Sequence, residues 1–253
     1  MAVELGLTPD GRWDIDLEEL VDVARGAGFA ALGLLASRAD AEAAAAYAAA
    51  GLRCHELLAL VVGDDGDSTV RYAGRLAEAA ALVDADWVLT TFQVGLTADS
   101  AKVIERCAAM FSDAGAAMAV EFSPLGPMTS ISDGLDVVRA AGAGRAGVMI
   151  DTWHFSFGDS TWEDLTAIPL EQIAYVQFSD APEPLSDDGI HETMNRRALP
   201  GDGVLELERF ASTLLDRDWE GLVSVEVLNE ELRAIPVGDF AHRAYEATAR
   251  YWS

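Results

Sequence analysis

The stretch Gly147-Val148-Met149-Ile150-Asp151-Thr152-Trp153-His154 gives the clearest indication of the fold. Three apolar residues lead into Asp151, and His154 follows three positions later. An apolar run of this length, preceded by Gly142 and Gly144, is typical of a buried strand. We therefore expect Asp151 to lie where a strand leaves the core.

The same pattern, an apolar strand that ends in a polar residue, occurs three more times. The three stretches are Ala119-Val120-Glu121, Ala174-Tyr175-Val176-Gln177 and Ser224-Val225-Glu226. We interpret the polar side chains at these four strand ends as one site, called the constellation below, and the rest of the chain as the scaffold that brings them together. The members of the constellation are Glu121, Asp151, Gln177 and Glu226.

Strand-type and helix-type segments alternate along the whole chain. The expected strands are 1–7, 29–35, 52–60, 87–92, 117–122, 147–150, 173–178 and 222–227. The expected helices are 16 to about 26, 38–50, 68 to about 82, 98–114, 131–141, 162–167, 206–216 and 237–251. A long polar loop is expected over 180–203, and long loops in compact domains are often functional.

This alternation predicts an α/β protein with a parallel sheet and right-handed crossovers. Eight units in 253 residues match the size of a (β/α)8 TIM barrel, which we expect as a single domain over 1–253. The alternative is an open doubly wound sheet, which normally carries a glycine-rich phosphate turn after its first strand. Here that turn reads Thr8-Pro9-Asp10-Gly11, which is not the phosphate-binding pattern.

The composition excludes several classes of partner. With 43 acidic against 17 basic residues the formal net charge is −26, which opposes nucleic-acid binding and attracts divalent cations. Two cysteines, Cys54 and Cys107, do not make a disulfide framework and favour a reducing compartment. We see no signal peptide and no run of about 18 apolar residues, so a cytoplasmic protein without a membrane partner is expected.

The constellation has the chemistry of a metal site. Active sites of such barrels lie at the carboxyl ends of the strands, where these four side chains would meet. Carboxylates that share one point need a compensating cation, or some of them must hold a proton. Three carboxylates and one amide oxygen suit a hard divalent ion such as Mg²⁺ or Mn²⁺. Any one of the four is equally compatible with simply ending its strand, but four on successive strands favour the shared site.

Several motifs resemble one known family. They are Val120-Glu121-Phe122-Ser123-Pro124, Ile150-Asp151-Thr152-Trp153-His154, Val176-Gln177-Phe178-Ser179-Asp180-Ala181, Val225-Glu226 and Arg197-Ala198-Leu199-Pro200-Gly201-Asp202-Gly203. The chain resembles the sugar phosphate isomerase/epimerase family, with its xylose isomerase-like TIM barrel. The resemblance covers essentially the whole chain and is most specific between 121 and 226.

The resemblance implies roles for individual residues. The family's metal ligands correspond to Glu121, Asp151, Gln177 and Glu226, with Gln177 standing where the family more often has histidine. The two glutamates correspond to the proton-transfer pair, Glu121 as base and Glu226 as acid. His154 corresponds to a residue near a substrate oxygen, and Arg197 to a substrate-contacting arginine of the loop.

For three of the candidate substrate-binding residues, a purely structural role in the core remains the alternative. His154 either reaches substrate or is a hydrogen-bonded core histidine. Glu56, at the end of the third expected strand, either lines the pocket or packs in the core. Trp153 either stacks on a sugar ring or is buried by packing.

The resulting hypothesis is a divalent-metal-dependent isomerase or epimerase that acts on a ketose, inosose or related polyhydroxy carbonyl compound. Proton removal next to a carbonyl would give an enediolate. A lyase of the same barrel, acting on a keto-polyol or dehydroshikimate-like substrate, shares that first step. A non-catalytic metal-binding subunit is the alternative of a different class. Barrels of this family often pair, so a homo-oligomer is compatible with the sequence.

Overall fold

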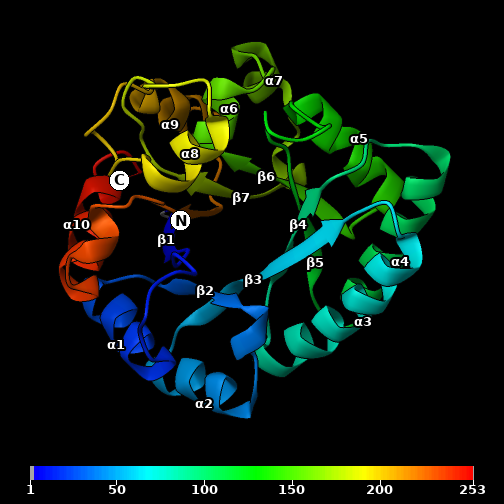
Figure 1. Cartoon of the computed structure of the whole chain (residues 1–253), viewed down its shortest axis with the longest axis horizontal. Helices are drawn as coiled ribbons and strands as arrows, with labels where there is room; N and C mark the ends of the chain where they lie inside the picture. Colours follow the sequence, from blue (N-terminus) through cyan, green and yellow to red (C-terminus); the bar gives the residue numbers. More distant parts are fainter. Residues whose placement is uncertain (1–2, 253) are drawn as a thin grey trace.

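Eight parallel strands close into a barrel in a computed structural model that describes residues 3–252. Each strand pairs with its sequence neighbours, and β1 pairs with β8 to complete the cylinder (Figure 1). The strands are β1 Glu4–Leu7, β2 Ala31–Leu35, β3 Arg53–Val62, β4 Trp87–Phe92, β5 Ala117–Glu121, β6 Ala146–Asp151, β7 Ile173–Phe178 and β8 Leu222–Val225. The predicted (β/α)8 barrel is confirmed.

Most of the helices form a ring around the strands, whereas α8 lies inside this ring in the view of Figure 1. The helices are α1 Leu17–Ala27, α2 Ala41–Ala50, α3 Gly66–Val83, α4 Ala98–Asp113, α5 Ile131–Ala141, α6 Thr152–Phe157, α7 Trp162–Ala167, α8 Gly189–Asn195, α9 Leu207–Leu215 and α10 Val237–Ala249. Side chains cap many of the helix starts; the hydroxyl of Thr97, for example, accepts the Ser100 N–H at the start of α4. Apolar residues between strands and helices make up the larger part of the core.

Two helices are missing from the sequence prediction, and the bounds of several other elements differ from it; β2 begins at Ala31 rather than 29, α2 at Ala41 rather than 38, and β8 ends at Val225 rather than 227. The sequence predicts no helix directly after Asp151 and none within 180–203, whereas α6 and α8 lie there. Both are shorter than two full apolar repeats, so periodicity cannot reveal them. Each begins at an aspartate, Asp151 or Asp188, whose side chain accepts backbone N–H groups. β3 also ends at Val62 rather than at 60.

Strand alternation carries the strand-end residues onto the inner face of the barrel. A small apolar cluster fills the lower interior, and it includes Ala119, Met149, Tyr175 and Leu222. Side chains two positions apart on a strand share a face. Glu121, Asp151 and Gln177 each stand two positions after a member of this cluster, so they continue the same inner face toward the mouth.

Other expectations concern the cysteines, the termini and the membrane. Cys54 and Cys107 are both free and buried. The first predicted strand begins at residues 1–2, which lie outside the described residues, and β1 begins at Glu4. No helix within residues 3–252 has the length and apolarity to span a bilayer.

Candidate active site

The four strand-end residues occupy one end of the barrel. Glu121 and Asp151 are the last residues of β5 and β6, Gln177 lies within β7, and Glu226 directly follows β8. Asp151 and Gln177 are paired neighbours across β6 and β7. The carboxyl ends of parallel strands share one edge of the sheet, so these residues surround the mouth of the barrel.

Asp151 is buried and uses both of its carboxylate oxygens. Oδ1 accepts the N–H groups of Trp153 at 2.6 Å and His154 at 3.0 Å, and thereby caps α6. Oδ2 accepts the Arg197 guanidinium at 2.6 Å. Burial opposes the charged form of Asp151, but Arg197 and His154 outweigh it, so the pKa of Asp151 lies below its ordinary value.

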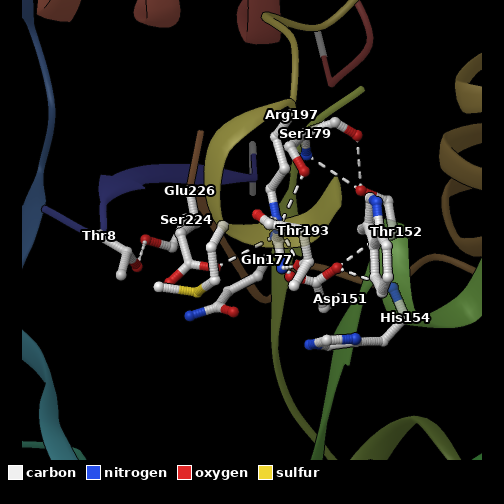
Figure 2. A network of polar contacts seen from close by, with 12 residues as sticks. Thr8, Asp151, Thr152, His154, Gln177, Ser179, Thr193, Arg197, Ser224 and Glu226 are labelled. Carbon is white, nitrogen blue, oxygen red and sulfur yellow. Dashed lines mark hydrogen bonds and ion pairs between the residues drawn. The ribbon is translucent and has the colours of Figure 1, made fainter. Parts of the chain in front are cut away.

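Arg197 lies between two of the predicted ligands. Its Nη1 is 2.6 Å from Asp151 and 3.1 Å from Glu226, and the side chain is 2% exposed (Figure 2). Thr193 holds the other side of the guanidinium through its carbonyl and hydroxyl oxygens. The Trp153 ring lies 5.8 Å from the guanidinium carbon, within cation–π range. A fully bonded guanidinium is thus fixed at the mouth of the barrel.

Glu226 shares this single cation with Asp151. Burial and nearby carboxylates raise the pKa of Glu226 to about 8, although Arg197 opposes the shift. Those carboxylates are Asp151, Glu121 and Glu56. The sequence argument expects either a compensating cation or a held proton. The buried Arg197 is such a cation, and the raised pKa of Glu226 favours its protonated form.

Glu121 pairs with His154 rather than with Arg197. The His154 ring nitrogen Nε2 lies 3.0 Å from Glu121 Oε1. The side chains are 13% exposed for Glu121 and 7% for His154. Glu121 also borders a pocket of about 170 Å³ that Thr91, Phe92, Ser123, Leu125, Gly126 and Met128 complete. A larger groove of about 820 Å³ lies on the outer face between α1 and α2, where none of the predicted site residues lines it.

Two residues predicted to contact substrate lie deeper than expected. Trp153 is 3% exposed and packs edge-on against His154, so its contacts are those of the core alternative. Glu56 is fully buried inside the barrel, and its carboxylate accepts the hydroxyls of Thr8 and Tyr175. Neither placement supports direct contact with a substrate.

The four predicted ligands offer oxygen atoms, which is the type of donor that a hard divalent ion prefers. Gln177 Oε1 is buried and has no hydrogen-bond partner within the described chain, which is the condition expected of an oxygen kept for a cation. Three carboxylates complete an all-oxygen set of the type that Mg²⁺ and Mn²⁺ prefer. Among residues 3–252, no three His, Cys, Asp or Glu side chains are already placed as a metal site. The shared ion therefore stays a prediction, and Arg197 is the cation beside Asp151 and Glu226.

Two residues that contact the candidate site or lie beneath it were not singled out by the sequence. Thr193 stands in the polar 180–203 segment, where nothing in the pattern distinguishes it from its neighbours. Tyr175 stands two positions before Gln177 on the same strand. Strand alternation alone could have placed it on the inner face.

Comparisons with known proteins agree with this architecture. The family model described as xylose isomerase-like TIM barrel matches residues 21–252. Among solved structures, the IOLI protein with a binding zinc atom superposes with a TM-score of 0.87 over 99% of this chain and 100% of that chain, at 17% identity. At that identity the likeness shows the fold alone.

Two curated relatives are enzymes. A 3-dehydroshikimate dehydratase of Pseudomonas aeruginosa is 32% identical over 101 residues, which cover 40% of this chain and 16% of that protein. An inosose isomerase of Bacillus licheniformis is 26% identical over 155 residues, which cover 60% of this chain and 55% of that protein. The chain therefore spans a small part of the dehydratase and about half of the isomerase.

Proposed function

The chain belongs to the xylose isomerase-like TIM barrel family, and we propose that it is a divalent-metal-dependent isomerase or epimerase of a ketose, an inosose or a related polyhydroxy carbonyl compound. The observation that carries the proposal is that two carboxylates at the barrel mouth stay partly exposed, while the other two predicted ligands are buried. The side chains of Glu121 and Glu226 are each 13% exposed. Asp151 and Gln177 are buried beneath them.

We assign Glu121 and Glu226 to the removal and return of a proton at the carbon next to the carbonyl, through an enediolate. His154 holds Glu121, and Arg197 holds Glu226, so each carboxylate is oriented before a substrate arrives. The two glutamates come from β5 and from the end of β8, on separate parts of the rim. A small substrate between them would present a different face to each.

The proposed metal ligands are Glu121, Asp151, Gln177 and Glu226. When bound, a hard divalent ion supplies positive charge that stabilises the negative charge developing on substrate oxygens. We favour Mn²⁺ or Mg²⁺ because all four donors are oxygens, whereas zinc in proteins is held mostly by nitrogen and sulfur.

A substrate without a phosphate group is favoured over a phosphorylated one. Arg196 and Arg197 are the arginines of the loop beside the site. Arg196 is paired with Glu192, and Arg197 with Asp151 and Glu226. Phosphate recognition normally recruits free guanidinium or ammonium groups, or a helix N-terminus, so both loop arginines are already engaged.

A lyase is the second candidate, and the match to a 3-dehydroshikimate dehydratase favours it. Dehydration begins with the same proton removal beside a carbonyl. The difference is that a hydroxyl leaves as water instead of the proton returning. Glu121 would then act as the base, and Glu226 would donate the proton to the leaving hydroxyl.

Deuterium exchange separates the candidates. The wild-type protein with Mn²⁺ would be incubated in D₂O with ketoses, inososes and 3-dehydroshikimate, and followed by NMR and mass spectrometry. Deuterium incorporation without loss of water supports the isomerase or epimerase, whereas loss of water supports the lyase. If no compound exchanges or dehydrates, both enzymatic proposals fail and the non-catalytic subunit stands.

Paired variants test the assigned roles. Glu121→Gln and Glu226→Gln should each lower the exchange rate by about 10²- to 10⁴-fold, the usual contribution of a general acid or base. Glu105→Gln, a change at an exposed glutamate of α4, serves as the matched control and should leave the rate unchanged. Exchange that continues at the wild-type rate in Glu121→Gln would contradict the assignment.

A further inference from the structure

Glu56 is a buried carboxylate whose oxygens are used entirely by the protein. Oε1 accepts the Thr8 hydroxyl, and Oε2 accepts the Tyr175 hydroxyl. His55 Nε2 lies 3.2 Å from Oε1. The side chain is 0% exposed, so Glu56 cannot reach a small molecule at the mouth of the barrel.

Space inside the barrel is reserved for this carboxylate. A Cβ atom at Gly33 of β2 would lie 2.7 Å from Glu56 Oε1 and 3.0 Å from its Cγ. Real Cβ contacts are almost never that short, so the glycine makes room for the glutamate. A buried carboxylate needs polar partners, and the room kept for Glu56 brings it within reach of Thr8, Tyr175 and Gln177.

Gln177 connects this carboxylate to the active site. Its Nε2 donates to Glu56 Oε2 at 3.4 Å. Its Oε1 is buried without a partner among the described residues. In the view of Figure 2 the amide oxygen of Gln177 lies on the side of Asp151 and the nitrogen points away from it. The two ends of one amide therefore face two different environments, an acceptor on one side and the active site on the other.

We propose that Glu56 is a positioning residue, which turns the Gln177 amide so that its oxygen rather than its NH₂ group faces the metal-binding position. This inference rests on the proposed function, because it gives the amide oxygen a cation to bind.

The chemistry of glutamine explains the need for such a residue. The two orientations of an amide have nearly the same shape, but only the oxygen has lone pairs that can bind a cation. A carboxylate facing the nitrogen accepts a hydrogen bond, whereas a carboxylate facing the oxygen would bring two acceptors together. Glu56 therefore favours the ligand-competent orientation, in the way that outer carboxylates orient metal-binding histidines.

Calorimetric titration of Mn²⁺ into metal-free protein tests the proposal. Glu56→Gln keeps the shape of the side chain but allows Gln177 to turn either way. We expect its Mn²⁺ affinity to fall about tenfold or more, as is usual when an outer partner of a metal ligand is removed. Tyr175→Phe removes another hydrogen bond to the same Glu56 oxygen but leaves the Gln177 contact, so its affinity should stay close to that of wild type. Gln177→Leu marks the full loss of the ligand.

A second measurement reports the orientation without a metal. The side-chain NH₂ signal of Gln177, identified by its loss in Gln177→Leu, should exchange slowly with solvent in wild type and shift in Glu56→Gln. Equal Mn²⁺ affinities in wild type and Glu56→Gln would overturn the inference, as would an equal loss in Tyr175→Phe. If wild type itself does not bind Mn²⁺, the proposed function loses its metal, and the Gln177 signal alone decides: an unchanged signal in Glu56→Gln rejects the positioning role.

Discussion

Arg197 is the residue on which the charge balance of the site depends. It is buried, and it holds Asp151 at 2.6 Å and Glu226 at 3.1 Å. The same two carboxylates are proposed metal ligands, so the guanidinium and a divalent ion draw on the same negative charge. Electrostatic repulsion between two cations a few Å apart inside a protein is substantial.

We expect Arg197→Met to bind Mn²⁺ more tightly than wild type, by about tenfold, because a competing positive charge is removed. The metal-free variant should be destabilised by about 3–5 kcal/mol, the usual cost of leaving buried charge without its partner. Calorimetry and thermal unfolding with and without Mn²⁺ measure both effects.

The adjacent Arg196 provides the control for this prediction. Arg196→Met removes a cation that pairs with Glu192 away from the strand ends, and it should leave the Mn²⁺ affinity unchanged. Weaker Mn²⁺ binding in Arg197→Met would contradict competition and would make Arg197 a support of the ion.

At the scale of elements, the segment that follows β7 is organised by Asp180. Its carboxylate accepts four backbone N–H groups, those of Ala181, Gly201, Gly203 and Leu205. A Cβ at Gly203 would lie 2.3 Å from Asp180 Oδ1, so only glycine allows this approach. The segment that carries Arg197 is thus fixed at both ends of its course over the barrel.

Asp180→Ala should release this segment. We expect a loss of about 3 kcal/mol in the free energy of unfolding, since four partly buried N–H groups lose their acceptor. The amides of Gly201 and Gly203 should exchange with solvent much faster than in wild type, as measured by hydrogen exchange. Slow exchange that persists at both glycines would show that Asp180 does not order the segment.

The sequence is informative about elements and less informative about partners. Apolar runs and helical periodicity predict all eight strands, and strand order alone brings Glu121, Asp151, Gln177 and Glu226 to one rim. The contact between Arg197 and Asp151 depends on how a long segment folds back, which no local pattern encodes. The burial of Glu56 likewise depends on which residues of neighbouring strands face each other inside the barrel. Gly33, which has no side chain, lies next to the Glu56 carboxylate.

At the scale of the whole molecule, Asp10 belongs to a network that links the β1–α1 loop, the segment after β8 and α8 where the first and last strands meet. It accepts Arg12 at 2.8 Å from the β1–α1 loop and Arg233 at 2.9 Å from the segment after β8. Arg12 also donates to the carbonyl of Met194 in α8. Burial would raise the pKa of Asp10, but the hydrogen bonds from Arg12 and Arg233 outweigh it and lower the pKa.

Asp10→Asn should destabilise the protein by about 2 kcal/mol at neutral pH, through loss of charged hydrogen bonds. Because the folded pKa of Asp10 is lowered, its contribution is fully present above the unfolded value of about 3.9 and is lost as pH falls through the folded value. The difference in unfolding free energy between wild type and variant should therefore shrink from about pH 4 downwards. Asp14→Asn, at an exposed neighbour, is the control; a difference that stays constant with pH would rule out this linkage.

The guanidinium between Asp151 and Glu226 also separates folding from metal loading. Carboxylates clustered without a cation resist burial, and a protein built in that way needs its ion before it can fold. Here Arg197, which lies 46 residues after Asp151 in the chain, supplies the positive charge that balances the carboxylates. The barrel can therefore fold without an ion at this position, and binding of the proposed ion would be a separate and later step.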